Sequence, residues 1–156
     1  NVIAGVVRRQ YTYLEEHIAQ KKAIYERYKE GLKGLPVQMN PFDETKCEPN
    51  YWLSAMIIDK EAMCKQVRDD TKALYIPEHG KSCPTEILEA IAGLNAEGRP
   101  VWKPMHKQPV YASAPAYVNG VSEAIFKVGM CLPAGPCVSD DDVRYIVECI
   151  KEAIEK

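Results

Sequence analysis

Apolar and amphipathic side chains recur at close to helical spacing over the first part of the chain. The positions are Ile3, Val6, Gln10, Leu14, Ile18, Ile24, Tyr25, Tyr28 and Leu32. They predict one long helix over residues 2–33, ended by Gly34 and Pro36. Such a helix would be roughly 45 Å long, which exceeds what a small domain can cover with its own core. We therefore expect its overhanging start, with Arg8 and Gln10, to pack on another region or on a second subunit.

Strand-like patterns are few and short. Residues 51–58 form an apolar run closed by Asp59, which predicts a buried strand. A second strand is expected over residues 130–133. Residues 36–50 are rich in Pro, Asn and Asp, so we expect them to form a connector.

Shorter helices are predicted around these strands. One is expected over residues 61–67, followed by a charged loop at 68–72. Pro84 opens another at its favoured first position, with apolar residues through Leu94. Ser122 is expected to cap a further helix that Gly129 ends.

The last helix has the clearest pattern. Ser139 is a typical N-cap, and three aspartates follow in the first turn, where the helix dipole favours anions. The buried stripe is expected at Val143, Ile146, Val147, Ile150 and Ile154. Capping explains the acidic run without a metal ion. The helices and short strands together predict an α+β fold with a small sheet.

Composition and charge exclude several classes of protein. The chain has 156 residues, 46% of them hydrophobic and 27% charged, which is ordinary for one globular domain. The net charge of -2 gives no electrostatic reason to expect nucleic acid or an anionic membrane as a partner. No signal peptide or membrane span is visible, so we expect a cytoplasmic location. The chain begins without Met and inside a helical pattern, so we expect it to be a piece of a longer protein.

The six cysteines point to packing rather than chemistry. No pair has Cys-x-x-Cys spacing, and none is matched with His at zinc-ligand spacing. His79 and Cys83 could form a metal pair only with further ligands, because structural zinc takes four. We therefore expect reduced, buried thiols and no metal site.

Sequence motifs for a complete catalytic apparatus are absent. The chain has no glycine-rich phosphate loop and no Gly-x-Ser-x-Gly nucleophile elbow. No local signature makes any cysteine a nucleophile. The sequence therefore indicates a domain that contributes to a site completed elsewhere.

The most distinctive stretch is residues 99–109, Arg-Pro-Val-Trp-Lys-Pro-Met-His-Lys-Gln-Pro, which we call the strip. Its three prolines disfavour a helix and predict a stiff segment that loses little entropy on binding a ligand. Arg99 and Lys103 could bind a carboxylate or phosphate. Trp102 offers a flat apolar face and His106 a donor or acceptor. The alternative is a proline-rich surface loop with an incidental histidine.

The strip resembles the Arg-Pro-x-Trp-Lys-Pro-Met-His-x-Gln-Pro motif of the DegT/DnrJ/StrS family. These enzymes are pyridoxal phosphate (PLP)-dependent nucleotide-sugar aminotransferases. Residues 1–10 resemble the helix after the family's Arg-Met-Ser-Asn motif, and residues 129–136 resemble its Gly-Leu-x-Leu-Pro-Ser-Gly turn. The resemblance covers essentially the whole chain, in the family's order.

The resemblance implies the small C-terminal domain of a type I PLP enzyme. This fold has a long connecting helix, here residues 1–34, and an α+β domain, here residues 36–156. It has a small, mainly antiparallel sheet with helices on one side. The large domain, with the PLP lysine, would precede residue 1. None of this chain's lysines matches that catalytic lysine, so the chain alone would be inactive, with no catalytic residue of its own.

The implied reaction moves an amine from glutamate to a keto group of a nucleotide-linked sugar. A UDP-4-keto-6-deoxy sugar for glycan synthesis is the expected substrate, and a homodimer the expected assembly. The strip supplies the expected substrate-binding residues. Trp102, Lys103, Met105 and His106 would line the pocket, while Arg99 and Gln108 would shape it or only brace the loop.

Two other readings remain open. One is a PLP-dependent dehydratase relative, in which histidine replaces the PLP lysine. The other is a non-catalytic dimerisation module that kept the fold. The residue that would distinguish the aminotransferase from the dehydratase lies outside this chain.

Overall fold

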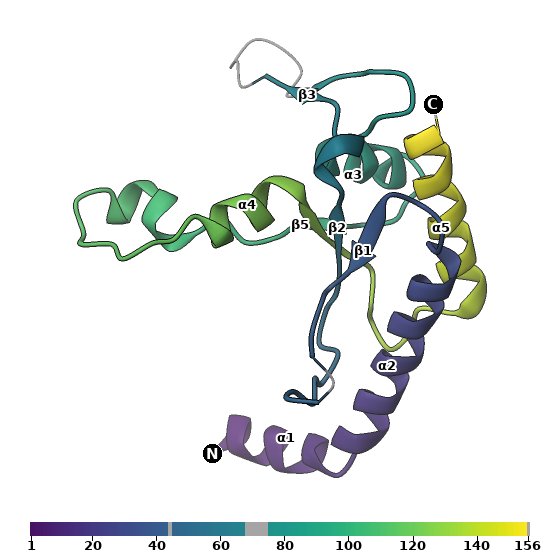
Figure 1. Ribbon diagram of the computed structural model, residues 1–156. Helices are drawn as coiled ribbons and strands as arrows, with labels where there is room; N and C mark the ends of the chain where they lie inside the picture. The colour runs from purple at the N-terminus through teal and green to yellow at the C-terminus, as the bar shows by residue number, and fades with distance from the viewer. Residues whose placement is uncertain (44, 68–74, 156) are drawn as a thin grey trace.

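A four-stranded antiparallel sheet lies at the centre of the molecule (Figure 1). The computed structural model describes residues 1–43, 45–67 and 75–155. The strand order is β1-β2-β6-β5. Their bounds are β1 Val37–Met39, β2 Ser54–Ile58, β5 Arg99–Pro100 and β6 Gly129–Leu132. A separate two-stranded sheet pairs β3 (Lys65–Gln66) with β4 (Tyr75–Ile76).

Burial explains why the central strands form where they do. All four residues of β6 are buried, as expected for an inner strand. In β2, buried and half-buried residues alternate from Ser54 to Ile58. Met56 of β2 faces Met130 of β6 in register, and both are fully buried.

The predicted strands are found, with shifted limits. The second predicted strand is confirmed as β6. The first begins only at Ser54, because Tyr51 has a positive φ of 52° and Trp52 is exposed. The expected connector at 36–50 contains an unforeseen edge strand, β1, whose Met39 is buried and pairs with Met56.

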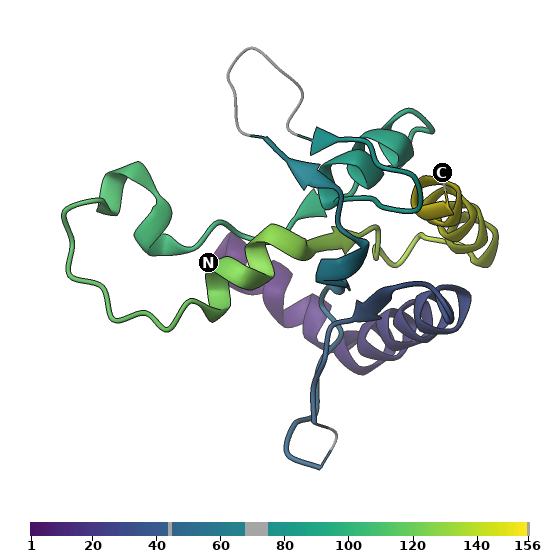
Figure 2. The ribbon, with the colours of Figure 1, turned by 45° about the horizontal axis from the view of Figure 1, so that its top comes forward.

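Three helices cover one side of the central sheet (Figure 2). They are α2 (Leu14–Gly31), α3 (Pro84–Ala92) and α5 (Asp140–Glu155), and α5 packs on both α2 and α3. Seven residues of α5 are buried, including every position of the predicted stripe. The predicted α+β class, with helices on one side of a small antiparallel sheet, is confirmed.

The predicted single long helix is instead two helices. α1 (Val2–Tyr11) ends before Thr12, and α2 starts at Leu14. The hydroxyl of Thr12 donates to the carbonyl of Arg9 at 2.9 Å, and the amide of Tyr13 donates to the carbonyl of Gln10 at 3.0 Å. Such side-chain bonds and tightened turns compete with the α-helical ladder. The predicted stop is confirmed, with Gly34 at φ 89°.

Two further helix predictions need correction. The helix expected over 61–67 is a 3₁₀ turn, η1 (Lys60–Ala62), followed by β3. The helix expected to be capped by Ser122 is α4 (Val121–Val128), which starts earlier. Its N-cap is Gly120 in the left-handed region, and Asn119 Oδ1 accepts from the amide of Val121. The charged loop predicted at 68–72 lies outside the described residues.

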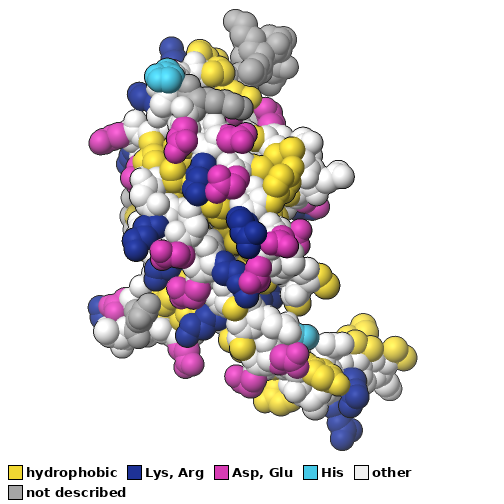
Figure 3. Space-filling view, turned by 90° about the vertical axis from the view of Figure 1, so that its right-hand side faces the viewer, with side chains coloured by type: hydrophobic (Ala, Val, Ile, Leu, Met, Phe, Trp, Pro, Cys, Tyr) yellow, Lys and Arg dark blue, Asp and Glu magenta, His cyan; other side chains and the backbone are white. Residues whose placement is uncertain are grey.

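The helix α5 is capped as its sequence predicts. The Ser139 hydroxyl accepts from the amide of Asp142, and the Asp142 carboxylate accepts from the amide of Ser139 at 2.8 Å. These reciprocal bonds form a capping box. The hydroxyl of Ser139 and then its amide, both donating to the Asp142 carboxylate, lower the pKa of Asp142. On the face shown in Figure 3, acidic and basic side chains are interspersed. Arg27 of α2 and Asp140 of α5 form an ion pair at 2.9 Å. This face is a solvated surface of mixed charge.

A long arm projects from the body opposite these helices (Figures 1 and 2). We define the arm as residues 103–120, which run through η2 (Met105–Lys107) and η3 (Pro109–Tyr111) and lead into α4. The strip was expected to avoid helix, yet the 3₁₀ turn η2 lies within it and η3 begins at its last residue, Pro109. Pro104 and Pro109 occupy N-cap and first-turn positions, where a missing amide costs nothing. No described helix is long and apolar enough to cross a membrane.

Candidate functional site

A cleft of about 680 Å³ lies where the strip meets α3 and α4. Three lysines and one glutamate are its charged residues: Lys103 and Lys107 of the arm, and Glu123 and Lys127 of α4. The lining residues are Gln66, Pro84, Thr85, Leu88, Pro100, Lys103, Lys107, Glu123, Phe126, Lys127 and Gly129. This excess of positive charge suits an anionic ligand.

Two glycines let the strip approach the body closely. A Cβ on Gly98 would lie 2.6 Å from Leu88 Cδ2 and 2.8 Å from Ile91 Cδ1. A Cβ on Gly129 would lie 2.8 Å from both the carbonyl of Ile125 and Val101 Cγ2. No side chain fits at either position without displacing these neighbours. The glycines therefore fix where the strip enters the wall of the cleft.

Glu123 ties the strip to α4. Its Oε1 lies 2.8 Å from His106 Nε2, and its Oε2 lies 3.1 Å from Lys107 Nζ. These contacts, His106 first, lower the pKa of Glu123, so the carboxylate is charged at neutral pH. When the neutral His106 ring donates from Nε2 to Glu123, its Nδ1 is left as an acceptor.

The structure brings only part of the predicted strip into the cleft. Lys103 lines it, and His106 reaches its edge through Glu123. Gln108 Nε2 lies 3.4 Å from both the Lys103 carbonyl and the Met105 sulfur, which braces the turn. Met105 is exposed, and Arg99 pairs with Glu97 instead of lining the cleft. The substrate-binding roles of these residues stay predictions.

Trp102 lies outside the cleft lining and forms an exposed aromatic pair. Its ring centroid is 6.1 Å from that of Trp52, with the planes inclined by 34°. Both indoles are more than half exposed. Exposed paired aromatic rings offer a flat apolar surface on the strip, outside the cleft.

Sequence reasoning missed Glu123 and Lys127. Both lie on α4, well beyond the strip, and neither stands at a motif spacing from His106. Only the fold of the arm back onto α4 brings them beside Lys103. No local sequence signal could have identified them.

The predicted interface residues lie on α1, away from this cleft. Both Arg8 and Gln10 are exposed, and α1 contains no buried residue. Arg8 lines a shallow, mainly apolar hollow of about 630 Å³ with Val7 and Tyr11. Their interface role stays a prediction.

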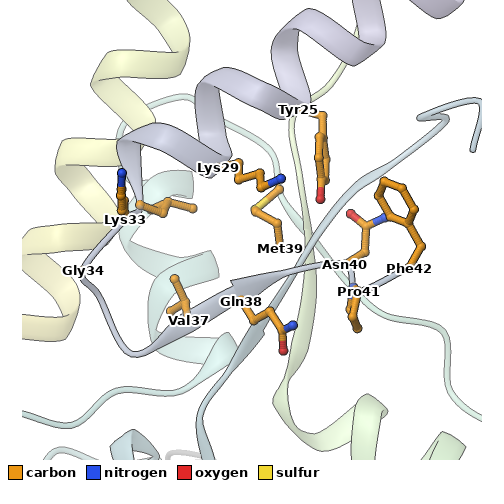
Figure 4. A pocket seen from close by; sticks show the side chains of 11 residues that line it. Tyr25, Lys29, Lys33, Gly34, Val37, Gln38, Met39, Asn40, Pro41 and Phe42 are labelled. Atoms are coloured by element: carbon orange, nitrogen blue, oxygen red, sulfur yellow. The ribbon is translucent and has the colours of Figure 1, made fainter. Parts of the chain in front are cut away.

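A separate hollow of about 390 Å³ lies between the end of α2 and β1 (Figure 4). Lys29 and Tyr25 point toward it from the helix, while Asn40 and Phe42 border it after the strand. It contains none of the strip residues and no pair of titratable groups suited to catalysis. We therefore place the candidate site at the lysine-lined cleft.

The cysteines divide into two groups. Cys47 and Cys137 are exposed, so the expectation that all six are buried is wrong for these two. Both lie in loops, outside the helices and strands. Burial raises the pKa of Cys64 to about 12 and raises those of Cys131 and Cys149, which makes these thiols poor nucleophiles.

Comparisons with known proteins identify relatives of the whole chain. The model of the DegT/DnrJ/EryC1/StrS aminotransferase family matches residues 1–151. EpsN of Bacillus subtilis, assigned as a pyridoxal phosphate-dependent aminotransferase, is 30% identical, and the match covers 96% of this chain and 34% of EpsN. GDP-perosamine synthase of Vibrio cholerae is 27% identical, over 97% of this chain and 36% of that enzyme.

Solved structures show the same fold. DesI, crystallised in the presence of its TDP-sugar product, superposes with a TM-score of 0.73 at 17% identity. The match covers 94% of this chain and 33% of DesI. The chain thus spans about a third of the length of the relatives it matches.

Proposed function

The chain belongs to the DegT/DnrJ/EryC1/StrS aminotransferase family, and from this premise we propose a role in sugar amination. The chain would be the C-terminal part of an enzyme that moves an amine from glutamate to a keto nucleotide sugar in glycan synthesis. The relatives EpsN and GDP-perosamine synthase support this class of reaction. A UDP-4-keto-6-deoxy sugar is the proposed substrate.

The proposed cofactor, PLP, would be held outside this chain. A lysine that holds PLP covalently is activated by desolvation or by a neighbouring cation in a closed pocket. The cleft lysines Lys103, Lys107 and Lys127 are exposed, so they do not fit that role. When bound, PLP supplies the electron sink for amine transfer. We assign it to the region that supplies the other two thirds of the relatives' length.

The residues of this chain would bind and orient the sugar nucleotide. Lys103, Lys107 and Lys127 would attract the diphosphate as point charges. Nδ1 of His106, held in place by Glu123, would accept a hydrogen bond from a sugar hydroxyl. Trp102 and Met105, which are exposed outside the cleft lining, would present apolar surface to the ligand, with Arg99 and Gln108 shaping the strip.

The lysine-lined cleft carries this proposal. Three cations face one carboxylate there, in a surface otherwise of mixed charge. A diphosphate brings two negative charges, which this excess would balance. The same cleft offers no group suited to nucleophilic catalysis, which agrees with a binding contribution to a site completed elsewhere.

A lysine series in the full-length protein tests the role of the cleft. We expect Lys107→Ala or Lys127→Ala to raise KM for the sugar nucleotide about tenfold, with a weaker effect at high salt. We expect kcat to change little, because the lysines bind substrate and transition state alike. Lys22→Ala on α2 is the matched control. An unchanged KM in all the cleft variants would remove the cleft from the substrate site.

The absorbance of the bound cofactor tests the reaction class. We expect the PLP band of the full-length protein to change on addition of glutamate, as a transaminase requires. If the PLP band did not change on addition of glutamate, and chemical reduction gave no PLP–lysine adduct, the dehydratase reading would be favoured. No cofactor binding would leave a structural module.

We further propose a homodimer in the cytoplasm. α1 exposes Val2, Ile3 and Tyr11, each more than two-thirds exposed, and buries no residue. A helix with such a face requires a covering surface. We expect Arg8→Glu with Gln10→Glu to weaken the dimer in sedimentation, while a monomeric parent protein would refute the assembly.

A further inference from the structure

A second group of side chains with binding chemistry lies beside the cleft, where the small β3–β4 sheet joins α3. Cys64 precedes β3, Cys83 is the N-cap of α3, and Glu86 lies in the first turn of α3. Their two sulfur atoms and a carboxylate oxygen all lie within 4.8 Å of one another. Both cysteines are buried, and Glu86 is half-buried.

The backbone holds these three side chains in place. Met63 and Ser82 form a parallel bridge, and the amide of Cys64 donates to the carbonyl of Ser82 at 3.0 Å. The amide of Ser82 donates to the carbonyl of Ala62 at 2.9 Å. The two thiols are therefore carried on neighbouring, hydrogen-bonded segments. Their approach does not depend on flexible side chains alone.

The carboxylate is also oriented. The buried hydroxyl of Ser82 donates to Glu86 Oε2 at 3.2 Å, which turns the carboxylate beside the sulfurs. Hydrogen bonds of this kind from outside the ligand set fix the ligands of metal sites. Of the four buried cysteines, Cys131 and Cys149 lack such a group among the described residues.

We propose that Cys64, Cys83 and Glu86 bind Zn²⁺, with water as the fourth ligand. Thiolates select soft or borderline cations, and two sulfurs with one oxygen suit a tetrahedral Zn²⁺. Binding requires small movements, because zinc ligands at about 2.0–2.3 Å from the metal lie within about 4 Å of one another. Zinc binding releases the two thiol protons to solvent, with no change of oxidation state.

The proposed ion would brace one wall of the lysine-lined cleft. Gln66, two residues after Cys64, and Pro84, the residue after Cys83, both line that cleft. A metal bridge between Cys64 and Cys83 would hold these two parts of the wall together. The zinc proposal itself does not depend on the proposed function, because metal binding is measured without any substrate.

Cobalt substitution in the full-length protein tests the proposal. We expect Co²⁺ to give sulfur-to-metal charge-transfer bands in the near ultraviolet and tetrahedral d–d bands in the red, and Zn²⁺ to abolish both. We expect the Cys64→Ser/Cys83→Ser variant to lose these bands. The matched controls are Cys131→Ser, at another buried thiol, and Cys47→Ser/Cys137→Ser, at the exposed thiols. Both controls should keep the bands.

A second variant guards against simple misfolding. Glu86 is half-buried, so Glu86→Gln should keep the fold by circular dichroism while weakening Zn²⁺ binding about tenfold or more. No cobalt spectrum in the wild type, or a spectrum unchanged in the double-cysteine variant, would overturn the proposal. It would also be overturned if Cys64 and Cys83 formed a disulfide on mild oxidation and bound no Co²⁺ when reduced.

Discussion

The body and the arm of this molecule are held together in different ways. In the body, α5 packs on α2 and α3, and its seven buried residues belong to a core that also contains residues of the sheet. In the arm, residues 111–120 are all exposed, and Tyr117 is 98% exposed. The body is stabilised by apolar burial, whereas polar contacts such as His106–Glu123 hold the base of the arm. The body therefore has a core of its own, whereas the outer part of the arm has none.

Like the outer part of the arm, α1 lacks buried residues. It has an apolar face but no buried residue, and its junction with α2 at Thr12 and Tyr13 is a single tightened turn. A short isolated helix is marginal in water, because helix nucleation is costly. The comparison thus separates the residues that stabilise the fold from those available for assembly and binding.

The largest difference is expected from truncation of a core side chain. Ile150 of α5 is fully buried, so Ile150→Ala should lower the free energy of unfolding by about 2–5 kcal/mol. Val110→Ala is the matched control in the arm, where the side chain is 76% exposed, and should change it by less than about 0.5 kcal/mol. Urea unfolding measures both. Equal losses would show that the arm is as tightly packed as the body.

Glycine-to-alanine changes should have opposite effects on stability at Gly98, which packs on α3, and at Gly5, which lies on the uncovered helix α1. Gly98→Ala places a Cβ against Leu88 and Ile91, so it should cost about 1–3 kcal/mol of unfolding free energy. Gly5→Ala in α1 meets nothing within 4 Å and should stabilise that helix by about 0.5–1 kcal/mol. Thermal unfolding checks both variants. A tolerated Gly98→Ala would mean that the strip does not pack closely on α3.

Removal of the buried Tyr28 hydroxyl should have a smaller effect on the free energy of unfolding. Tyr28 is fully buried, and its hydroxyl donates to the carbonyl of Pro133 at 2.9 Å. Burial raises the pKa of Tyr28, so the phenol stays protonated as a donor. Tyr28→Phe should cost about 1 kcal/mol, whereas Tyr117→Phe in the arm should have no effect. Equal denaturation midpoints for the two variants would show that the Tyr28–Pro133 hydrogen bond does not contribute to the stability of the fold.

The sequence predicted elements set by apolar burial better than features set by hydrogen bonding, and the reason is physical. The apolar stripe of α5 and the buried run of β6 are local patterns set by burial. The edge strand β1 was missed because only its pairing with β2 defines it. The break at Thr12 was missed because the apolar spacing continues across it, although a hydroxyl-to-carbonyl bond interrupts the helix there.

Only the part of the candidate site that lies in the strip could be predicted from the sequence. Lys103 and His106 stand in the strip and could be selected from the sequence alone. Glu123, Lys127 and the Cys64–Cys83 pair could not, because tertiary contacts between distant segments bring them together. A single sequence carries no record of such contacts unless a known spacing marks them.

The smallest expected effect concerns acid release of the arm. The pKa of Glu123 lies below its ordinary value of 4.5, because His106 and then Lys107 hold the charged carboxylate. A lowered folded-state pKa gives stability that is present above pH 4.5 and is lost as the pH falls through the folded value. The pKa of Asp142 is also lowered, so its protonation in the same acidic pH range weakens the cap of α5. A measurement of total stability therefore does not isolate Glu123.

The difference between wild type and Glu123→Gln does isolate it. We expect Glu123→Gln to speed amide hydrogen exchange in residues 105–111 at neutral pH, while exchange in α5 is unchanged. Below the lowered pKa of Glu123, wild type and variant should exchange at the same rate in the arm, since the protonated carboxyl of wild type is then neutral, as the amide of the variant is at any pH. If the exchange rates of wild type and variant still differed in acid, the charge of Glu123 would not be what holds the arm. The contacts of the uncharged side chain would then account for the difference.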